Sequence, residues 1–291
     1  MAVSGNADGL PSAFFLCPNT AQKVKVTGME LTRKLRFINP DVPPHTYGRM
    51  AVIDIGSSSI RLVVYEDVRN YPYMILNQKV WCALGKGKGD GDFYIEDARM
   101  ERACTAIEWF IWVAKETGAT SLFAVATSAV REAKNGQQFV ECLRERLGVE
   151  VSIIDGEAEA KLSAKGACAS IPDADGLVVD LGGGSLELYD TREKRFESLP
   201  LGVLSLREIS KDNPKKAADV LYKEIMQVPW MNDIGPSIVA IGSGMRAIAR
   251  LHMAEYKYPL KILHDYHLRK DTGTNFCKRI ITGEVSKTTS D

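Results

Sequence analysis

The 291-residue sequence has no excess of charge of either sign, because 37 Lys and Arg side chains balance 37 Asp and Glu side chains. A neutral chain has no long-range attraction to nucleic acid or to an anionic membrane, so a site for a polyanion must be a local cluster. The sequence also lacks an uncharged run of about 18 residues, the length that a membrane-spanning helix needs. We therefore expect neither a DNA partner nor a membrane partner.

Several signatures of common sites are missing as well. The six cysteines form no CxxC pair, and the four histidines show neither metal-ligand nor triad spacing. This pattern argues against a disulfide framework and predicts a reducing, cytoplasmic environment. The sequence contains no GxxxxGK[ST] phosphate loop and no GxSxG nucleophile elbow.

Strands and helices alternate along most of the chain, which predicts the α/β class. Residues 1–47 lack sustained periodicity and are expected to be a poorly ordered leader. At about 100–200 residues per domain, the remainder divides into lobes at 48–169 and 170–268, followed by a frayed tail at 269–291. Helices are expected at about 95–117, 135–147, 156–170 and 215–226.

A short repeat is the most informative feature of the sequence. Val52–Leu62 (VIDIGSSSIRL) aligns with Val178–Leu188 (VVDLGGGSLEL), and both have the form apolar-apolar-Asp-apolar-Gly-small-small-Ser. Each copy is expected to form a strand, a tight turn and a second strand. Two lobes built in the same way would place the two turns around one cleft.

Turns of this composition suit phosphate, because Gly and Ser allow successive backbone N–H groups to approach an anion. Asp54 and Asp180 end the first strand of each copy, and a carboxylate there needs a bridging cation such as Mg²⁺. A plain β-hairpin turn is the alternative interpretation. A third turn, Gly242-Ser243-Gly244, opens a helix and offers an anion site, although its spacing also fits a dinucleotide-binding fingerprint.

Hydrolysis of a phosphoanhydride requires an oriented water molecule and neutralisation of charge. Glu159, in the first turns of a helix after a strand, and Glu187, after the second turn, are candidate water-activating carboxylates. Glu157 fits helix capping better. The candidate phosphate-binding cations are Arg131, Lys161 and Arg246; Lys86 and Lys88 would guide a polyanion or belong to a solvated loop.

Five ordered motifs resemble the exopolyphosphatase and guanosine pentaphosphate phosphohydrolase family of the actin, sugar-kinase and heat-shock ATPase superfamily. The motifs are VIDIGSSSIRLVVYE, VATSAVREAKN, IIDGEAEAKLSAKG, VVDLGGGSLEL and AIGSGMRAIA. The resemblance covers about residues 50–268. It implies two ribonuclease-H-like lobes with a cleft between them and Mg²⁺-dependent release of a terminal phosphate.

By motif position, the resemblance makes Glu159 the catalytic glutamate and Glu187 the second acid, which positions water. Asp54 and Asp180 correspond to the metal-associated aspartates. The residues that correspond to the family's phosphate-binding positions are Gly56, Ser57, Ser58, Ser59, Arg131, Gly182, Gly183, Gly184, Ser185, Gly242, Ser243 and Gly244.

The sequence departs from the family pattern at Ser58, Met245 and Lys161, where Asn, Thr and Arg are usual. The long C-terminal helical region of some members is also missing, which puts processivity in doubt and makes a homodimer plausible. Expected partners are polyphosphate or guanosine penta- or tetraphosphate. Two alternatives stay open: a phosphotransferase acting between polyphosphate and a nucleotide, and a non-catalytic sensor of polyphosphate or alarmone.

Overall fold

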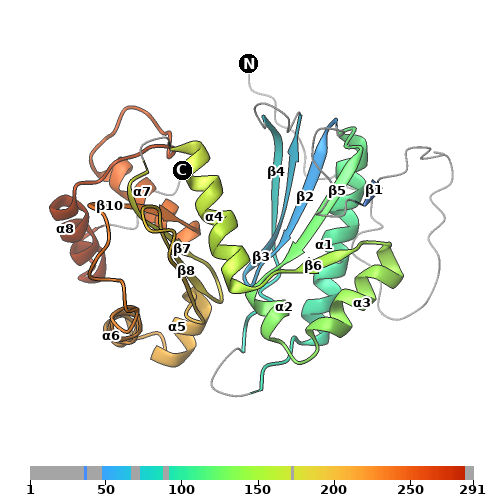
Figure 1. The fold of residues 1–291 in the computed structure, drawn as a ribbon, viewed down its shortest axis with the longest axis horizontal. Coiled ribbons are helices and arrows are strands. Elements are labelled where there is room, and N and C mark those ends of the chain that lie inside the picture. The colour runs from blue at the N-terminus through green and yellow to red at the C-terminus, as the bar shows by residue number, and fades with distance from the viewer. Residues whose placement is uncertain (1–35, 38–47, 67–72, 88–91, 172–173, 286–291) are drawn as a thin grey trace. The chain divides into compact units, whose positions relative to one another are not determined.

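A computed structural model describes residues 36–37, 48–66, 73–87, 92–171 and 174–285, and these residues form two β-sheets with helices around them (Figure 1). The predicted leader, 1–47, lies outside the described residues except for the short strand β1 (Arg36–Phe37). None of the described helices is long and apolar enough to cross a lipid bilayer. The cysteines in the described part of the chain are all free.

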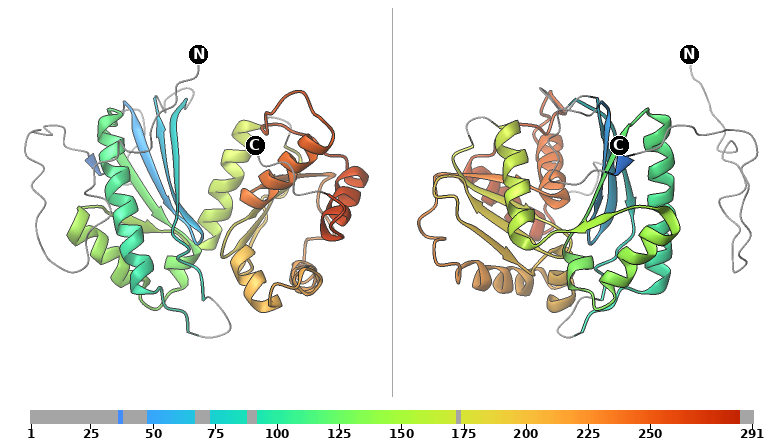
Figure 2. Two further views of the ribbon diagram at one scale, coloured as in Figure 1. Left: turned by 180° about the vertical axis from the view of Figure 1, so that it is seen from behind. Right: turned by 45° about the vertical axis from the view of Figure 1, so that its right-hand side comes forward.

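The first sheet has the order β1-β5-β2-β3-β4, with β6 also beside β5. Strands β2 (Met50–Ile55), β3 (Ser59–Tyr65) and β4 (Met74–Trp81) run antiparallel, whereas β5 (Ser121–Ala126) is parallel to β2 and β6 (Val151–Ile153) is parallel to β5. Alternate residues of β2 and β3 are buried, and helix α1 (Asp97–Glu116) packs on that face. Figure 2 shows α1 along the sheet from two other sides.

Two further helices complete this part of the chain. Helix α2 (Ser128–Glu132) follows β5 directly, and α3 (Gly136–Leu147) ends at Gly148 in the left-handed conformation typical of a helix terminus. Phe110 of α1 and Phe139 of α3 are fully buried in the same core as Ile53 and Leu62 of the sheet. This core holds β2 and β3 rigidly, so the turn between them has a fixed position.

The second sheet repeats this connection of strands. Its order is β10-β7-β8-β9, in which β7 (Gly176–Leu181), β8 (Leu186–Asp190) and β9 (Phe196–Leu199) are antiparallel and β10 (Ser237–Ile241) is parallel to β7. The antiparallel hairpin β7–β8 therefore corresponds to β2–β3, and β10 corresponds to β5. The predicted α/β class with two similarly built lobes is confirmed.

Helix α4 (Gly156–Ser170) belongs to the second sheet in space, which differs from the expected boundary between residues 169 and 170. Ala160, Ala164 and Ala167 lie at helical spacing, and the last two pack against Val178 of β7. Small side chains let the helix approach β7, β8 and β9 closely. The position of α4 along the chain suggested that it belongs to the first lobe, but its alanine face packs on the second sheet.

The last helices lie on the second sheet's side of the chain: α5 (Val203–Ser210), α6 (Pro214–Ile225), α7 (Ser243–Glu255) and α8 (Lys270–Ile281). The expected frayed tail at 269–291 is wrong for α8, although residues 286–291 lie outside the described part. Phe276 of α8 is 1% exposed and meets the ring of His252 edge-on at 4.8 Å. Phe276 is the one buried side chain of α8, so a single aromatic anchor fixes this helix.

We predict that Phe276→Ala lowers the free energy of unfolding by about 3–5 kcal/mol, because it leaves a cavity against His252 and Tyr256. Ile281→Ala in the same helix is the matched control, since Ile281 is 58% exposed and its loss should cost under about 0.5 kcal/mol. Urea unfolding of the full chain measures both. Equal effects of the two substitutions would show that α8 is not packed.

Candidate active site

The two repeated sequences form two equivalent turns. In the first, the backbone N–H of Gly56 donates to the carbonyl oxygen of Ser59 at 3.1 Å, and in the second the N–H of Gly182 donates to the carbonyl oxygen of Ser185 at 3.0 Å. The same hydrogen bond thus closes both turns at the same position of the repeat. The hairpin geometry does not exclude the phosphate-loop interpretation, because the Gly and Ser residues of both turns allow an anion to approach the backbone closely.

The turns also touch each other. A Cβ atom placed on Gly183 would lie 2.2 Å from Oγ of Ser58 and 3.0 Å from its backbone nitrogen. No side chain fits at that distance, so glycine is the residue that permits this approach. The sequence repeat therefore places its two turns at one location, as expected for lobes that share a site.

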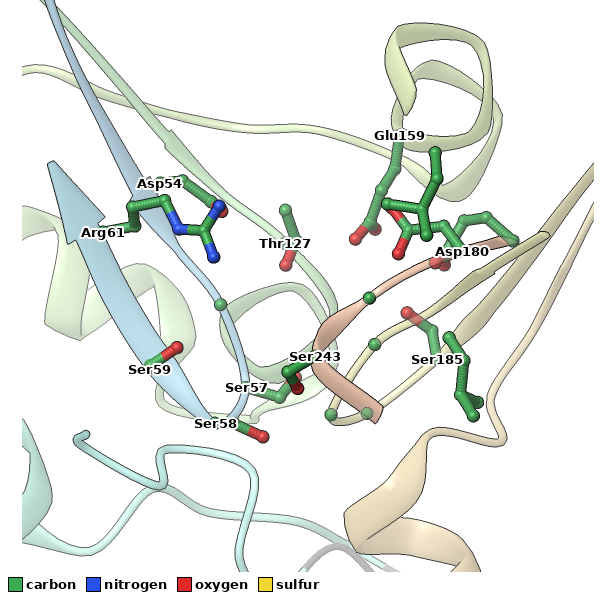
Figure 3. Close-up of a pocket in the computed structure, with 18 of the residues that line it drawn as sticks. Asp54, Ser57, Ser58, Ser59, Arg61, Thr127, Glu159, Asp180, Ser185 and Ser243 are labelled. Atoms are coloured by element: carbon green, nitrogen blue, oxygen red, sulfur yellow. The ribbon is translucent and has the colours of Figure 1, made fainter. Parts of the chain in front are cut away.

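A pocket of about 190 Å³ opens above this contact. Figure 3 shows Asp54 and Arg61 on one side, Glu159 and Asp180 on the facing side, and Thr127 between them. All but two of the site residues expected from the sequence line the pocket: Asp54, Gly56, Ser57, Ser58, Ser59, Glu159, Asp180, Gly182, Gly183, Gly184, Ser185, Glu187, Gly242 and Ser243. The exceptions are Arg131 and Gly244.

The strand register determines which charged residue lies beside each aspartate of the pocket. Asp54 pairs with Arg61 across β2 and β3, and Asp180 pairs with Glu187 across β7 and β8. Arg61 and Glu187 occupy the same position of the repeat. The two lobes therefore have one backbone plan but present opposite charges beside their aspartates.

Three cations line the pocket: Arg61, Lys79 and Arg246. Burial lowers the pKa of Lys79, and the nearby Arg61 and Arg246 lower it further. Burial and repulsion by Arg61 likewise lower the pKa of Arg246. Cations that repel one another in a confined space favour an anionic ligand between them.

Sequence reasoning missed Arg61, Lys79 and Thr127 as pocket residues. Arg61 aligns with Glu187 in the repeat, and Glu187 was a candidate site residue, so the alignment already pointed to Arg61. Lys79 pairs with Arg61 across β3 and β4, and Thr127 follows β5 as Gly242 follows β10. These two positions depend on which strands are neighbours.

Glu159 enters the pocket from the first turn of α4, whose N-terminus is capped by the Asp155 side chain. One Glu159 oxygen accepts a hydrogen bond at 2.9 Å from Nη1 of Arg131, which also donates to the carbonyl oxygen of Ile154. Burial raises the pKa of Glu159, against the opposing effect of Arg131. Arg131 thus orients Glu159 without lining the pocket itself. The expected contact of Arg131 with phosphate stays a prediction.

Among the four acids that line the pocket, Glu187 has the smallest exposed surface, 3%. Burial and the nearby Glu159 raise the pKa of Glu187 to about 8, although hydrogen bonds from Ser185 and Ser198 oppose the shift. This shift favours the protonated form of Glu187 near neutral pH. Glu159 and Glu187 share the pocket but differ in their hydrogen-bond partners, which suits different roles.

Asp54 and Asp180 form a pair of carboxylates on facing walls. Asp54 faces the water of the pocket but is surrounded by protein atoms. Burial raises the pKa of Asp54, and the nearby Asp180 raises it further, whereas Arg61 opposes both effects. Asp180 accepts a hydrogen bond from the Ser163 hydroxyl at 2.7 Å. Among the described residues, no group of three His, Cys, Asp or Glu side chains could hold a metal by itself.

The remaining charged candidates lie outside the pocket. Lys161 pairs with Glu157 one helical turn away and lies 5.1 Å from the ring centre of Phe196. This pairing agrees with a surface role for Glu157. Lys86 is exposed, and Lys88 lies outside the described residues.

Residues 63–289 match the model of the Ppx/GppA phosphatase family. The chain belongs to the Ppx/GppA phosphatase family. The match begins within β3, after the first turn, and continues through the second hairpin to α8, so the segment expected to be a tail is part of the family's region.

Curated relatives in this family include the protein named exopolyphosphatase 1 from Mycobacterium tuberculosis, which is 31% identical over 173 residues, 57% of this chain and 50% of the relative. The protein of the same name from Mycobacterium leprae is 31% identical over 208 residues, 69% of this chain and 61% of the relative. The chain therefore spans about half to three-fifths of the length of these relatives.

Solved structures show the same fold. The Aquifex aeolicus member of the Ppx/GppA family is 29% identical, with a TM-score of 0.57 over 74% of this chain and 72% of that chain. A Cytophaga hutchinsonii exopolyphosphatase is 23% identical, with a TM-score of 0.66 over 80% of each chain. The sequence-based family resemblance is confirmed.

We predict that Glu187→Gln changes how stability depends on pH. The folded state keeps the Glu187 proton up to about pH 8, whereas the unfolded chain releases it above about 4.5, so this group lowers the free energy of unfolding as pH rises between those values. The slope approaches about 1.4 kcal/mol per pH unit. In Glu187→Gln this loss disappears, so the variant gains stability relative to the parent at higher pH.

Urea unfolding at pH 5.5 and at pH 7.5 measures this difference. Glu193→Gln, which replaces an exposed carboxylate in the turn after β8, is the matched control and should follow the parent at both values. A Glu187→Gln difference that stays constant between the two pH values would contradict a buried, protonated carboxyl group.

Proposed function

We propose that the chain hydrolyses a terminal phosphoanhydride bond and releases phosphate from inorganic polyphosphate. The observation that carries the proposal is the contact of two Gly-Ser turns beneath a pocket that holds four carboxyl groups and three cations. Such turns bind phosphate oxygens, and the acids above them can orient water. The relatives named exopolyphosphatase support the same activity.

In this proposal the terminal phosphate lies on the two turns, with donors from Ser57 and Ser58 and from the backbone. Glu159 faces the phosphate from α4, fixed by the guanidinium of Arg131 at 2.9 Å. Water attacks phosphorus, the anhydride P–O bond breaks, and the proton of the water passes to the Glu159 carboxylate. Arg61, Lys79 and Arg246 neutralise charge on the transferred and leaving oxygens.

Asp54 and Asp180 fit the metal that this chemistry uses. Mg²⁺ takes one or two carboxylates and completes its shell with water and phosphate oxygens, so two facing aspartates are enough without a third protein ligand. When bound, Mg²⁺ would offset the negative charge of the substrate. Glu187 would hold water in place beside Glu159 through its proton and its neighbouring serines.

The pocket lining favours an inorganic chain over a nucleotide. Among the described residues that line it, none is aromatic, so nothing there stacks on a base. Its three cations and its serine hydroxyl groups suit phosphate. The 5′ phosphate of guanosine pentaphosphate is the second candidate substrate, because the reacting group is the same.

We predict that Glu159→Gln lowers kcat for phosphate release by about 10²–10⁴-fold, because the amide cannot accept the proton. Glu157→Gln is the matched control, since Glu157 lies two residues earlier in the same helical turn and pairs with Lys161. Its rate should stay near that of the parent. Release of phosphate with Mg²⁺ from polyphosphate of defined length and from guanosine pentaphosphate provides the measurement.

The same assay separates the alternatives. Equal rates for parent and Glu159→Gln would refute the role of Glu159. Transfer of labelled phosphate to ADP rather than to water would identify a phosphotransferase. Micromolar binding with no turnover by the parent would identify a sensor.

We predict that Asp180→Asn raises the Mg²⁺ concentration for half-maximal phosphate release by about tenfold or more, because it removes one of two anionic ligands. Ser163→Ala removes only the hydrogen bond to Asp180 and leaves the carboxylate, so its Mg²⁺ requirement should change much less. Titration of Mg²⁺ after chelator treatment tests both variants. Undiminished turnover of the parent in excess chelator would exclude the proposed metal role.

A further inference from the structure

A second cavity, of about 490 Å³, has no part in the proposed hydrolysis. One wall comes from the end of β4, the loop after it and α1, and the other wall comes from α5 and the residues that follow it. The cavity is lined by Trp81, Ala83, Lys86, Arg99, Arg102, Leu204, Arg207, Glu208, Lys211 and Asp212. None of these residues lines the catalytic pocket.

The first wall rests directly on the first Gly-Ser turn. The N–H groups of Cys82 and Ala83 both donate to the carbonyl oxygen of Ser58, at 3.1 and 2.8 Å, and Gly85 N–H donates to the Ser57 carbonyl at 2.9 Å. Figure 3 shows this segment in pale teal on one side below Ser58, with the pale gold helix α5 on the other side. The cavity thus lies behind the turn.

The second wall rests on the second turn in the same way. The N–H groups of Val203 and Leu204 donate to the carbonyl oxygens of Gly182 and Gly183, at 3.0 and 2.8 Å. A Cβ atom on Gly202 would lie 2.3 Å from the Gly183 backbone, so α5 begins in direct contact with the turn. The contact between the two turns therefore separates the cavity from the catalytic pocket.

Positive charge dominates the cavity, with five cations and two carboxylates in its lining. Arg207 pairs with Asp212 at 2.7 Å, and Arg99 pairs with Glu96 at 2.9 Å. Glu208 accepts a hydrogen bond from the Gly87 N–H at 2.7 Å, which links the two walls. Among the described residues, no acidic side chain pairs with Lys86, Arg102 or Lys211.

We propose that this cavity is a second binding site, for a phosphate chain. The unpaired cations lie on both walls: Lys86 and Arg102 on one, Lys211 on the other. A phosphate chain carries several charges along a short length, so one molecule can satisfy both walls, and arginine binds its oxygens through two parallel hydrogen bonds. The chain can be inorganic or can belong to a nucleotide whose base stacks on Trp81, which is 56% exposed.

The test uses the full chain with Glu159→Gln, so that a probe is bound rather than consumed. Calorimetry with tripolyphosphate should show two sites per chain. Arg102→Gln with Lys211→Gln should weaken one site by about tenfold or more, and Arg61→Gln with Arg246→Gln should weaken the other. The two sites are thus assigned independently, and a failure of hydrolysis in the proposed function would leave this result unaffected.

Lys215→Gln with Lys216→Gln is the matched control, because both side chains are exposed on α6 and the change in net charge is the same. It should retain both sites. The site is refuted if Arg102→Gln with Lys211→Gln binds like the parent, or if the control loses as much affinity. Arg102→Lys with Lys211→Arg should restore binding, which excludes misfolding as the cause of the loss.

A second arm uses GTP to distinguish the sources of the phosphate chain. Cavity binding of GTP that falls in Trp81→Ala, with tripolyphosphate binding unchanged, identifies a nucleotide whose base uses the indole ring. Equal tripolyphosphate and GTP affinities that are insensitive to Trp81→Ala identify the inorganic chain as sufficient. Binding of neither probe in the cavity overturns the proposal.

Discussion

The contact between the two Gly-Ser turns is the constraint on which the rest of the structure depends. Gly183 approaches Ser58 so closely that a methyl group would collide with it. This approach brings Asp54 and Asp180, which lie 126 residues apart in the sequence, to one pocket. Each turn is in turn held by a rigid hairpin, because the strands on either side are packed in separate cores.

The two lobes share one backbone plan but differ in the charged residue beside each aspartate. Both lobes have an antiparallel hairpin with a parallel strand beside it, and each hairpin ends in an Asp before the turn. The partner of that Asp is Arg61 in one lobe and Glu187 in the other. A symmetrical pair would place like charges together, whereas this pair combines a cation with an acid, which the proposed hydrolysis uses for phosphate and for water.

Sequence reasoning succeeded where the relevant information was local. The repeat predicted both hairpins and both aspartates. Apolar spacing predicted α1 and α3, and the helices expected at 156–170 and 215–226 match α4 and α6 to within a few residues. It failed where neighbours in space decide the outcome. Lys79 reaches the pocket through strand pairing, α4 joins the second sheet through its alanine face, and α8 is anchored by Phe276; in each case the partner in space decides the position.

The turn contact also connects the two anion sites that we propose. The catalytic pocket lies on one side of it, and the basic cavity lies on the other, with each cavity wall hydrogen-bonded to the back of one turn. A ligand that bridges the cavity walls would favour the arrangement in which the turns touch, and the same arrangement completes the catalytic pocket. Binding at one site would therefore increase affinity at the other, since any ligand that stabilises a shared conformation does so reciprocally.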